Sequence, residues 1–328
     1  MNLQNLLQRI YPTHRWRKRI IIAAKILVVF AAMYILGTEI RGRALLDILN
    51  ELHWDSRQKT LLTIFMLLAF INMGLDAFLW KSISAVNQKV SFATALFHHL
   101  CSLSLASITP YNVGEFGGKQ RQYQAPLEKL KAVYLTYVFR FVKMSARNLV
   151  GALSLLYLVQ HDVFIWVSQW QAVFILIIAL VIVVVYFQQE RIIPIISGIV
   201  VLGKKIFLPL GRILPSTGIK IRWLILGLLK FMVYPLQFLL ALMIFEHDLV
   251  ASISLMAMIW LYYSLSAFLP SIQAIDPLVK GGAGIFILTG WVSNPGTILL
   301  ATTLVWFINV AIPAFIGALF FLKTKKPN

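Results

Sequence analysis

Residues 137–153 read YVFRFVKMSARNLVGAL and carry three basic side chains, Arg140, Lys143 and Arg147, inside an apolar stretch. At 100° per residue the three side chains lie within roughly 60° of one another on one helical face. The stretch has to belong to a membrane span, because a span that began after Arg147 would have only about ten apolar residues before His161. The fold must therefore accommodate cations that each cost about 2.5 to 3.5 kcal/mol near the centre of a bilayer.

The composition of the whole chain also indicates a membrane protein. Of its 328 residues, 59% are hydrophobic and 13% are charged, whereas soluble domains carry about 25% charged residues. Lys and Arg number 30 against 12 Asp and Glu, which gives a formal net charge of +18. Because the polar stretches are short loops, we interpret this excess as the positive-inside bias of cytoplasmic loops, and we expect no nucleic-acid partner. The single cysteine, Cys101, excludes a disulfide framework.

Six apolar segments are long enough to cross a hydrocarbon core of about 30 Å. They cover residues 20–37, 61–80, 132–158, 164–187, 221–245 and 297–322. No small-residue cleavage site follows the first segment, so we expect it to be a retained signal-anchor helix. The Lys and Arg bias of the loops places both termini and residues 188–220 in the cytoplasm. We expect an all-α, multi-pass protein of the plasma membrane, which in a bacterium is the inner membrane.

Two further apolar segments are interrupted. Residues 92–109 contain His98 and His99 and are followed by a break at Pro110. A helix that enters the bilayer, breaks and returns fits this composition and the number of loops on each side. A related break occurs at Pro270, and aligning the two prolines superposes two further residues, Ser104 on Ser264 and Leu105 on Leu265. Each break precedes a polar, glycine-rich stretch, TPYNVGEFGGKQR in the first case and LPSIQAIDPLVKGGAG in the second.

These features predict a single transmembrane domain over residues 1–328 with two re-entrant helices. The halves, about residues 20–187 and 221–322, would form an inverted repeat of the kind found in many transporters. Residues 188–220 would join them, either as a basic helix on the cytoplasmic leaflet or as a solvated linker. If the broken segments cross the bilayer fully, the number of spans rises from six to seven or eight.

The first glycine-rich stretch could contact a ligand. Glycine lets the backbone approach a ligand closely, and basic side chains can hold phosphate. The residues in question are the hinge residues Pro110, Gly114, Gly117 and Gly118 and the side chains Glu115, Lys119 and Arg121. Alternatively, Glu115 and Lys119, four residues apart, form an ordinary helical ion pair.

The second stretch offers Asp276, Lys280, Gly281 and Gly282, after the hinge at Pro270, for a similar role. Neither stretch is a nucleotide-binding loop. The position that requires the first glycine of such a loop holds Val113, and Gln120 follows the lysine in place of Ser or Thr. We therefore expect no ATPase activity, and we expect neither a metal site nor a cofactor.

The three cations of residues 137–153 allow two interpretations. Either they form a water-accessible face that meets an anionic group, or they pair with Asp76, Glu115 or Asp276 and lock helices together. One nearby carboxylate cannot neutralise all three cations. Lys230 lies deep in its span, ahead of Pro235, and is a secondary candidate for the same path.

Taken together, the two glycine-rich regions resemble a flippase-like membrane family that includes the transmembrane part of lysylphosphatidylglycerol synthetases. The resemblance rests on Pro110, Gly114, Glu115, Lys119, Arg121 and Arg140 in the first half and on Pro270, Gly281, Gly282 and Gly284 in the second. The chain departs from the family in its second motif, where SIQAIDPLVK separates Pro270 from Gly281 and no acid follows the glycines.

The resemblance implies translocation of a lipid or a lipid-linked group. Only KTKKPN follows the last span, so the resemblance does not extend to the aminoacyltransferase domain, and we expect no lipid synthesis. Our leading hypothesis is a nucleotide-independent flippase or transporter whose partner is an anionic phospholipid or a polyprenyl phosphate. The alternatives are a lipid-modifying membrane enzyme that uses Glu115 or His98 and His99 as acid–base groups, and a scaffold or regulator that only holds anionic lipid.

Overall fold

The computed structural model describes residues 54–120, 125–191, 215–269 and 271–323, together with residues 48, 50, 52 and 123. This part of the chain is all-helical and contains no β-strand. The predicted first span at 20–37 and most of the segment 188–220 lie outside the described residues, as do Arg121 and Pro270.

Five helices in the described part are long and apolar enough to cross a membrane. They are α4 (Ser56–Ser84), α7 (Pro126–Gln160), α8 (Gln169–Phe187), α11 (Thr217–Phe245), and the continuous helix formed by α14 (Pro295–Trp306), the π-helical turn η3 (Phe307–Ala311) and α15 (Ile312–Lys323). Four of the six predicted spans fall within these helices, and a fifth, 164–187, begins five residues before α8, so the prediction of an all-α membrane protein is confirmed for the described residues.

Polar residues set the starts of these helices. The carboxylate of Asp55 accepts a hydrogen bond from the backbone N–H of Gln58 at the start of α4. This bond holds the pKa of Asp55 below its ordinary value. Ser168 and Gln171 form a capping box at the start of α8. Each of these apolar helices therefore begins at a polar residue, which suits a position at the membrane surface.

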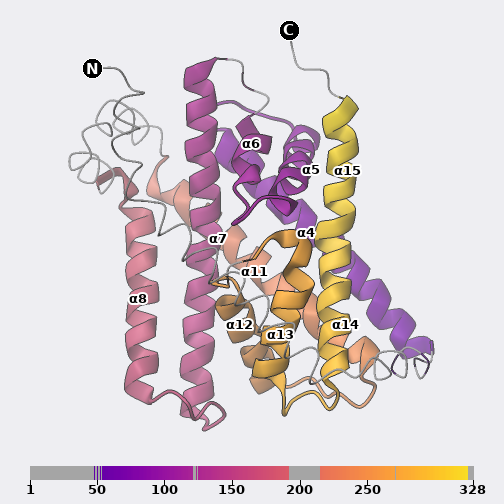
Figure 1. The fold of residues 1–328 in the computed structure, drawn as a ribbon. Helices are drawn as coiled ribbons and strands as arrows, with labels where there is room; N and C mark the ends of the chain where they lie inside the picture. The colour runs from indigo at the N-terminus through magenta and orange to yellow at the C-terminus, as the bar shows by residue number, and fades with distance from the viewer. Residues whose placement is uncertain are drawn as a thin grey trace, which may run out of the picture.

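Two pairs of shorter helices lie between the long ones. The first pair, α5 (Phe92–Ser107) and α6 (Gly114–Gln120), lies at the upper end of the molecule in Figure 1, and α6 packs back against α5. The second pair, α12 (Ile253–Ser266) and α13 (Asp276–Leu288), lies at the lower end, with the short 3-10 helix η2 (Gln273–Ile275) between its members. In each pair the chain reverses direction between the two helices, near the middle of the molecule.

The two reversals meet. Pro110 and Ile272 form an isolated antiparallel β-bridge, so the break after α5 touches the break after α12. The turn that follows Pro110 holds two consecutive residues in the left-handed region, Tyr111 at φ 52° and Asn112 at φ 57°. That conformation costs roughly 1–2 kcal/mol for each residue with a side chain. The tight turn lets α6 fold back directly along α5.

The glycines of the first motif serve this packing. A Cβ atom on Gly114 would lie 2.1 Å from the backbone oxygen of Leu105, and one on Gly118 would lie 2.5 Å from Cα of Ser102. Both neighbours are backbone atoms of α5, so they cannot move aside as a side chain could. The structure thus gives these two glycines a role in the contact between helices, and their predicted contact with a ligand stays a prediction.

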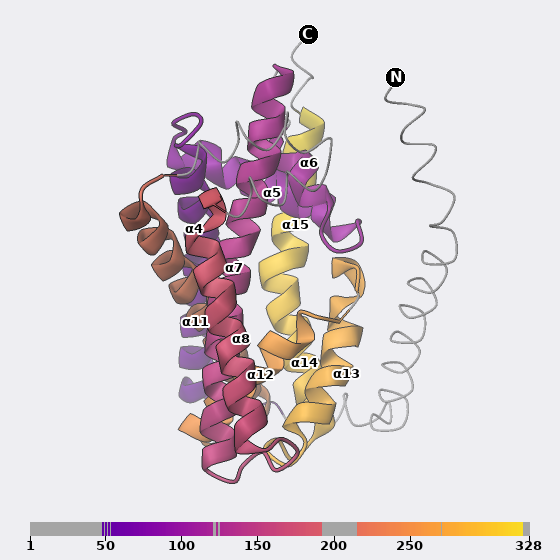
Figure 2. The ribbon, with the colours of Figure 1, turned by 90° about the vertical axis from the view of Figure 1, so that its left-hand side faces the viewer.

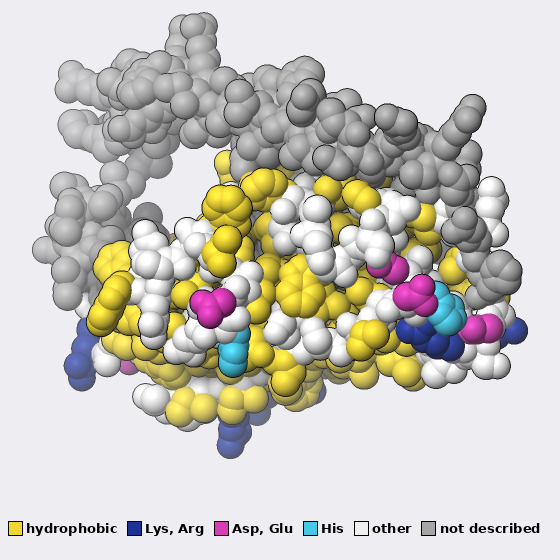
Figure 3. Space-filling model, turned by 90° about the horizontal axis from the view of Figure 1, so that it is seen from below, with side chains coloured by type: hydrophobic (Ala, Val, Ile, Leu, Met, Phe, Trp, Pro, Cys, Tyr) yellow, Lys and Arg dark blue, Asp and Glu magenta, His cyan; other side chains and the backbone are white. Residues whose placement is uncertain are grey.

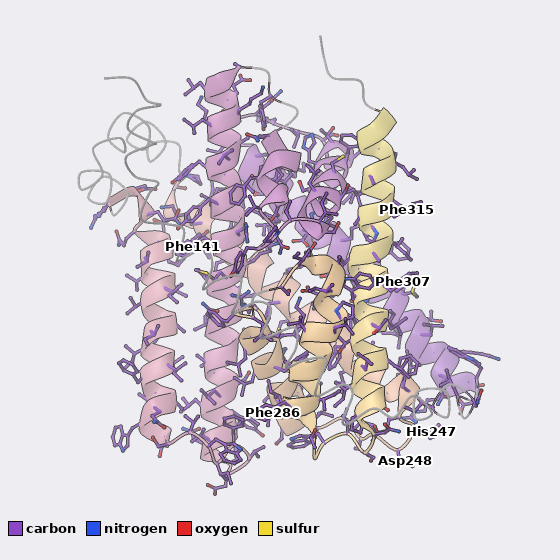
Figure 4. The ribbon with its side chains drawn as sticks, viewed as in Figure 1. Phe141, His247, Asp248, Phe286, Phe307 and Phe315 are labelled. Carbon is purple, nitrogen blue, oxygen red and sulfur yellow. The ribbon has the colours of Figure 1, made fainter. Side chains whose placement is uncertain are left out.

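The long helices run side by side around the broken pairs. In two views at right angles, α7, α8 and the α14–α15 helix stand roughly parallel (Figures 1 and 2). Aromatic side chains such as Phe286, Phe307 and Phe315 lie exposed on the outside (Figure 4). An exposed apolar surface of this kind suits contact with lipid chains. The polar residues considered below lie within the ring of helices.

Substitution of Gly118 tests the close contact between α5 and α6. We expect Gly118→Ala to destabilise the protein by about 1–3 kcal/mol, because the added methyl group meets backbone. Gly74→Ala is the matched control, since nothing lies within 4 Å of a Cβ atom there. Thermal unfolding in detergent should show a lower Tm for Gly118→Ala only. Equal melting of the two variants would contradict the packing role.

Candidate functional site

A cavity of about 290 Å³ opens where the two broken pairs meet. It has roughly the volume of ten water molecules in the liquid. The lining combines residues of α4, α5, α6, α7, α11, α12, α13 and η3. The charged side chains of the lining are Asp76, Glu115, Lys143, Arg147, Lys230, Asp276 and Lys280, and His99, Asn72, Asn309 and Gln273 also contribute.

Asp76 forms the centre of one cluster in this lining. Its side chain is 7% exposed, and Nζ of Lys230 lies 2.5 Å from Oδ2 while Nζ of Lys143 lies 3.3 Å from Oδ1. Nε2 of His99 lies 3.7 Å from Oδ2. A single carboxylate on α4 thus faces two lysines, one from α7 and one from α11. In a position this well buried, removing the carboxylate would leave two cations uncompensated.

A chain of amide side chains continues from this cluster. Lys230 donates to Oδ1 of Asn72 at 2.6 Å, and Nδ2 of Asn72 donates to Oδ1 of Asn309 at 2.6 Å. Nδ2 of Asn309 in turn donates to Oε1 of the buried Gln237 at 3.0 Å. Asn309 lies in the π-helical turn η3, and such turns occur often at functional sites. The amide chain fixes the position of Lys230 relative to the α14–α15 helix.

Glu115 forms the centre of a second cluster. Nζ of Lys119 lies 2.7 Å from Oε1, and Nε of Arg140 lies 3.8 Å from Oε2. Arg140 also donates to the backbone oxygen of Tyr111 at 2.9 Å, which ties α7 to the turn after α5. The helical ion pair that the spacing allowed is therefore present in the structure.

Lys119 lies beside the cavity and is not part of its lining. Its side chain is fully buried, with Nζ 3.3 Å from the ring centroid of Phe139 and 4.5 Å from that of Trp80. Cation–π contacts of this kind stabilise a desolvated ammonium group. The structure thus places Lys119 among aromatic rings, next to one carboxylate oxygen of Glu115. Arg140 lies near the other oxygen of that carboxylate.

The second motif contributes one ion pair to the lining. Nζ of Lys280 lies 2.5 Å from Oδ2 of Asp276, and the hydroxyl of Ser271 donates to the other carboxylate oxygen. The glycines of this motif face other helices. A Cβ atom on Gly281 would lie 2.8 Å from Cδ1 of Leu299 on α14, and Gly282 is buried. Asp276 and Lys280 thus both line the cavity, while Gly281 packs α13 against α14.

Arg147 differs from the other cations of the lining. Among the described residues it forms no ion pair with a carboxylate, and its Nε is buried without a hydrogen-bond partner. The guanidinium carbon lies 5.6 Å from the ring centroid of Phe268. Ser264 donates to the backbone oxygen of Arg147 at 3.0 Å and so holds α12 against α7. Arg147 therefore presents a cation to the cavity without a carboxylate beside it.

The structure brings together most of the predicted residues and adds others. Asn72 and Asn309 were not predicted, because single amides in apolar segments are common. Asp76 was considered only as a possible partner for the cations of α7, although an acid inside a predicted span is itself a signal of function. The described residues contain no group of three side chains suited to a metal ion.

Replacement of Asp76 tests the first cluster. We expect Asp76→Ala to destabilise the protein by about 3–5 kcal/mol, because Lys143 and Lys230 would lose their shared carboxylate. Asp248→Ala is the matched control, since that side chain is fully exposed and its ion pair with His247 is worth little. Thermal unfolding in detergent should separate the two variants clearly. A Tm for Asp76→Ala equal to that of Asp248→Ala would contradict the role assigned to the cluster.

Comparison with known proteins adds no assignment to this geometry. No protein-family model matches the chain, and no curated protein matches it. The resemblance of the two motifs to a flippase-like family therefore stays a prediction from the sequence.

Proposed function

We propose that the protein is a nucleotide-independent transporter or flippase for an anionic lipid or a lipid-linked anionic group. The observation that carries this proposal is Arg147, a cation that faces the cavity with no carboxylate beside it. A charge held in this way inside a membrane protein is expensive unless water or a ligand compensates it. An anionic headgroup would supply the missing partner. The resemblance to the flippase-like family points to the same class of substrate.

The two broken pairs support a transport path. With 16 residues, α5 is about 24 Å long, which is shorter than a hydrocarbon core of about 30 Å. We infer that the α5–α6 pair and the α12–α13 pair are re-entrant, one from each side of the membrane, and that they belong to an inverted repeat. Transporters of this design place the substrate site where the broken helices meet. The cavity lies at that point, next to the bridge between Pro110 and Ile272.

The charges at the two ends support an orientation. Basic residues predominate at the end that carries the C-terminus of α8 and the N-termini of α7 and α11, where Lys81, Lys89, Lys129, Lys131, Arg191, Lys220 and Arg222 lie. The opposite end carries four acids, Asp55, Asp162, Glu246 and Asp248, against two basic residues at the start of α4, Arg57 and Lys59. Figure 3 shows both kinds of charge on this face. By the positive-inside rule the basic end is cytoplasmic, and the membrane is the plasma membrane, which in a bacterium is the inner membrane.

The size of the cavity fits a headgroup. A volume of about 290 Å³ holds a phosphate with a small substituent, but it is too small for acyl or prenyl chains as well. The side chain of Lys143 lines the cavity and is 30% exposed, so a ligand can reach it, whereas Arg140, 34% exposed, does not line the cavity. We infer that the headgroup passes through the cavity while the apolar chains stay in the lipid.

Transport in liposomes tests this function. Purified protein should accelerate the leaflet exchange of fluorescent phosphatidic acid or phosphatidylglycerol above the rate in protein-free liposomes. Arg147→Gln should lower the added rate by about tenfold or more, because tenfold corresponds to only about 1.4 kcal/mol of lost interaction. Arg222→Gln is the matched control, since Arg222 is exposed and does not line the cavity.

Two results would count against this function. One is wild-type protein that adds nothing to the rate of exchange for any anionic lipid. The other is equal activity of the Arg147→Gln and Arg222→Gln variants, which would remove the observation on which the proposal depends.

Accessible cysteines test the orientation. In a Cys101→Ser background, which removes the only native cysteine, Asp248→Cys and Lys129→Cys each place one thiol at an exposed position at opposite ends. We expect a membrane-impermeant maleimide to label the Asp248→Cys variant in intact cells and the Lys129→Cys variant only after lysis. The reverse pattern would invert the orientation.

A further inference from the structure

Four amide and hydroxyl side chains of the cavity lining form no hydrogen bond within the described part of the chain. They are the amides of Asn112 and Gln273 and the phenols of Tyr234 and Tyr263. The other hydroxyl and amide groups of the lining are bonded within the protein, namely those of Ser102, Ser266, Asn72 and Asn309. A few polar groups with unused hydrogen-bonding capacity are what fixes the orientation of a ligand in a cavity.

The two amides come from the two breaks. Asn112 lies two residues after Pro110, and Gln273 directly follows Ile272, so each break supplies one amide beside the bridge. The turn uses only the backbone of Asn112, whose N–H donates to Thr109 and whose oxygen accepts from Glu115. Oε1 of Gln273 is buried without a partner. The indole of Trp306 donates to the backbone oxygen of Gln273 at 2.7 Å, which holds this residue against the α14–α15 helix.

The two phenols come from neighbouring helices. Tyr234 belongs to α11 and Tyr263 to α12, and their rings contact edge to face with centroids 5.1 Å apart. Phe238 packs against the ring of Tyr263 at 5.5 Å. Ring packing thus holds both side chains at the cavity and leaves their hydroxyl groups free to bond.

These groups require a ligand that can donate hydrogen bonds. An anion accepts hydrogen bonds and cannot donate one, so it would leave Oε1 of Gln273 unpaired. An alcohol hydroxyl both donates and accepts, and it therefore suits amides and phenols alike. A buried acceptor without a partner is unfavourable, so a ligand with hydroxyl groups would bind better than the same ligand without them.

The charges of the lining suit a phosphodiester. With His99 neutral, the lining contains four cations, Lys143, Arg147, Lys230 and Lys280, against three carboxylates, Asp76, Glu115 and Asp276. A single negative charge on the ligand balances this excess. A phosphodiester carries one negative charge, and its second ester can join the phosphate to an alcohol that has further hydroxyl groups.

We propose that the cavity binds a phosphodiester headgroup whose alcohol carries free hydroxyl groups, a glycerol or a single sugar. The two amides and two phenols bind these hydroxyl groups, while Arg147 pairs with the phosphate. This inference rests on the proposed function and narrows its substrate class. The shared chemistry is the hydroxylated phosphodiester, and the lipid that carries it is either a diacylglycerol or a polyprenyl chain.

Matched lipids test the role of the hydroxyl groups. Fluorescent phosphatidylglycerol and fluorescent phosphatidylpropanol with the same acyl chains have the same charge and the same three-carbon alcohol, but phosphatidylpropanol lacks the free hydroxyl groups. In proteoliposomes, after subtraction of the protein-free rate, we expect phosphatidylglycerol to exchange at least about fivefold faster. Fivefold corresponds to about 1 kcal/mol, which is within the cost of an unpaired buried acceptor.

Competition separates the two lipid sources. Unlabelled phosphatidylglycerol and an unlabelled polyprenyl phosphohexose, added at equal mole fractions, should each slow the exchange of fluorescent phosphatidylglycerol, and the stronger competitor identifies the source. Competition by neither lipid would contradict a common site.

Variants connect the preference to the lining. Gln273→Leu removes the amide at similar size and should lower the ratio of the phosphatidylglycerol rate to the phosphatidylpropanol rate by about threefold or more. Tyr234→Phe removes one hydroxyl group and should lower the same ratio. Tyr137→Phe is the matched control, since Tyr137 is 49% exposed and does not line the cavity. If Gln273→Leu and Tyr234→Phe both keep the wild-type ratio, whatever their total rates, these residues only pack and the assignment is overturned.

The outcomes for the two proposals differ. If wild-type protein moves phosphatidylpropanol as fast as phosphatidylglycerol, or moves phosphatidic acid alone, the selectivity is wrong and the transport function stands. If it accelerates none of the three lipids, the transport function fails and this inference fails with it.

Discussion

Asp76 contacts lysines from two other helices, and in the apolar interior none of the three charges can be buried alone. The carboxylate on α4 meets Lys143 on α7 and Lys230 on α11, and His99 on α5 lies beside it. Desolvation makes each isolated charge unfavourable, so the three side chains are stable only when their helices stay together. The ion pairs thus fix how α4, α7 and α11 lie around the cavity, while apolar packing determines how tightly they approach.

The remaining cations follow from the same constraint. Asp76 pairs with two lysines, Glu115 pairs with Lys119 and Arg140, and Asp276 pairs with Lys280. None of these carboxylates forms an ion pair with Arg147 among the described residues. A structure built only for stability would be expected to replace such a cation by an apolar residue, since buried ion pairs themselves are often replaceable without loss. The proposed binding of an anionic group would give Arg147 the partner that the described interior does not supply.

The sequence predicted the spans well because apolar length is a strong and local signal. The segments at 61–80, 132–158 and 221–245 each fall within one long helix. The partners of the charges were harder to predict, because an ion pair such as Asp76 with Lys230 joins residues more than 150 positions apart. The packing of the first-motif glycines could not be predicted for another reason. Glycine permits close approach to a ligand or to another helix equally, and the sequence does not show that Leu105 and Ser102 lie against Gly114 and Gly118.

The bridge between Pro110 and Ile272 has a mechanical consequence. It is an isolated pairing with no strand on either side, so the two broken pairs share only a short stretch of backbone contact at that point. The contact of α6 with α5, and of α13 with α14, is much more extensive. The two breaks can therefore separate at this point while the packing inside each pair, and of α5 on α15 and α12 on α7, stays intact.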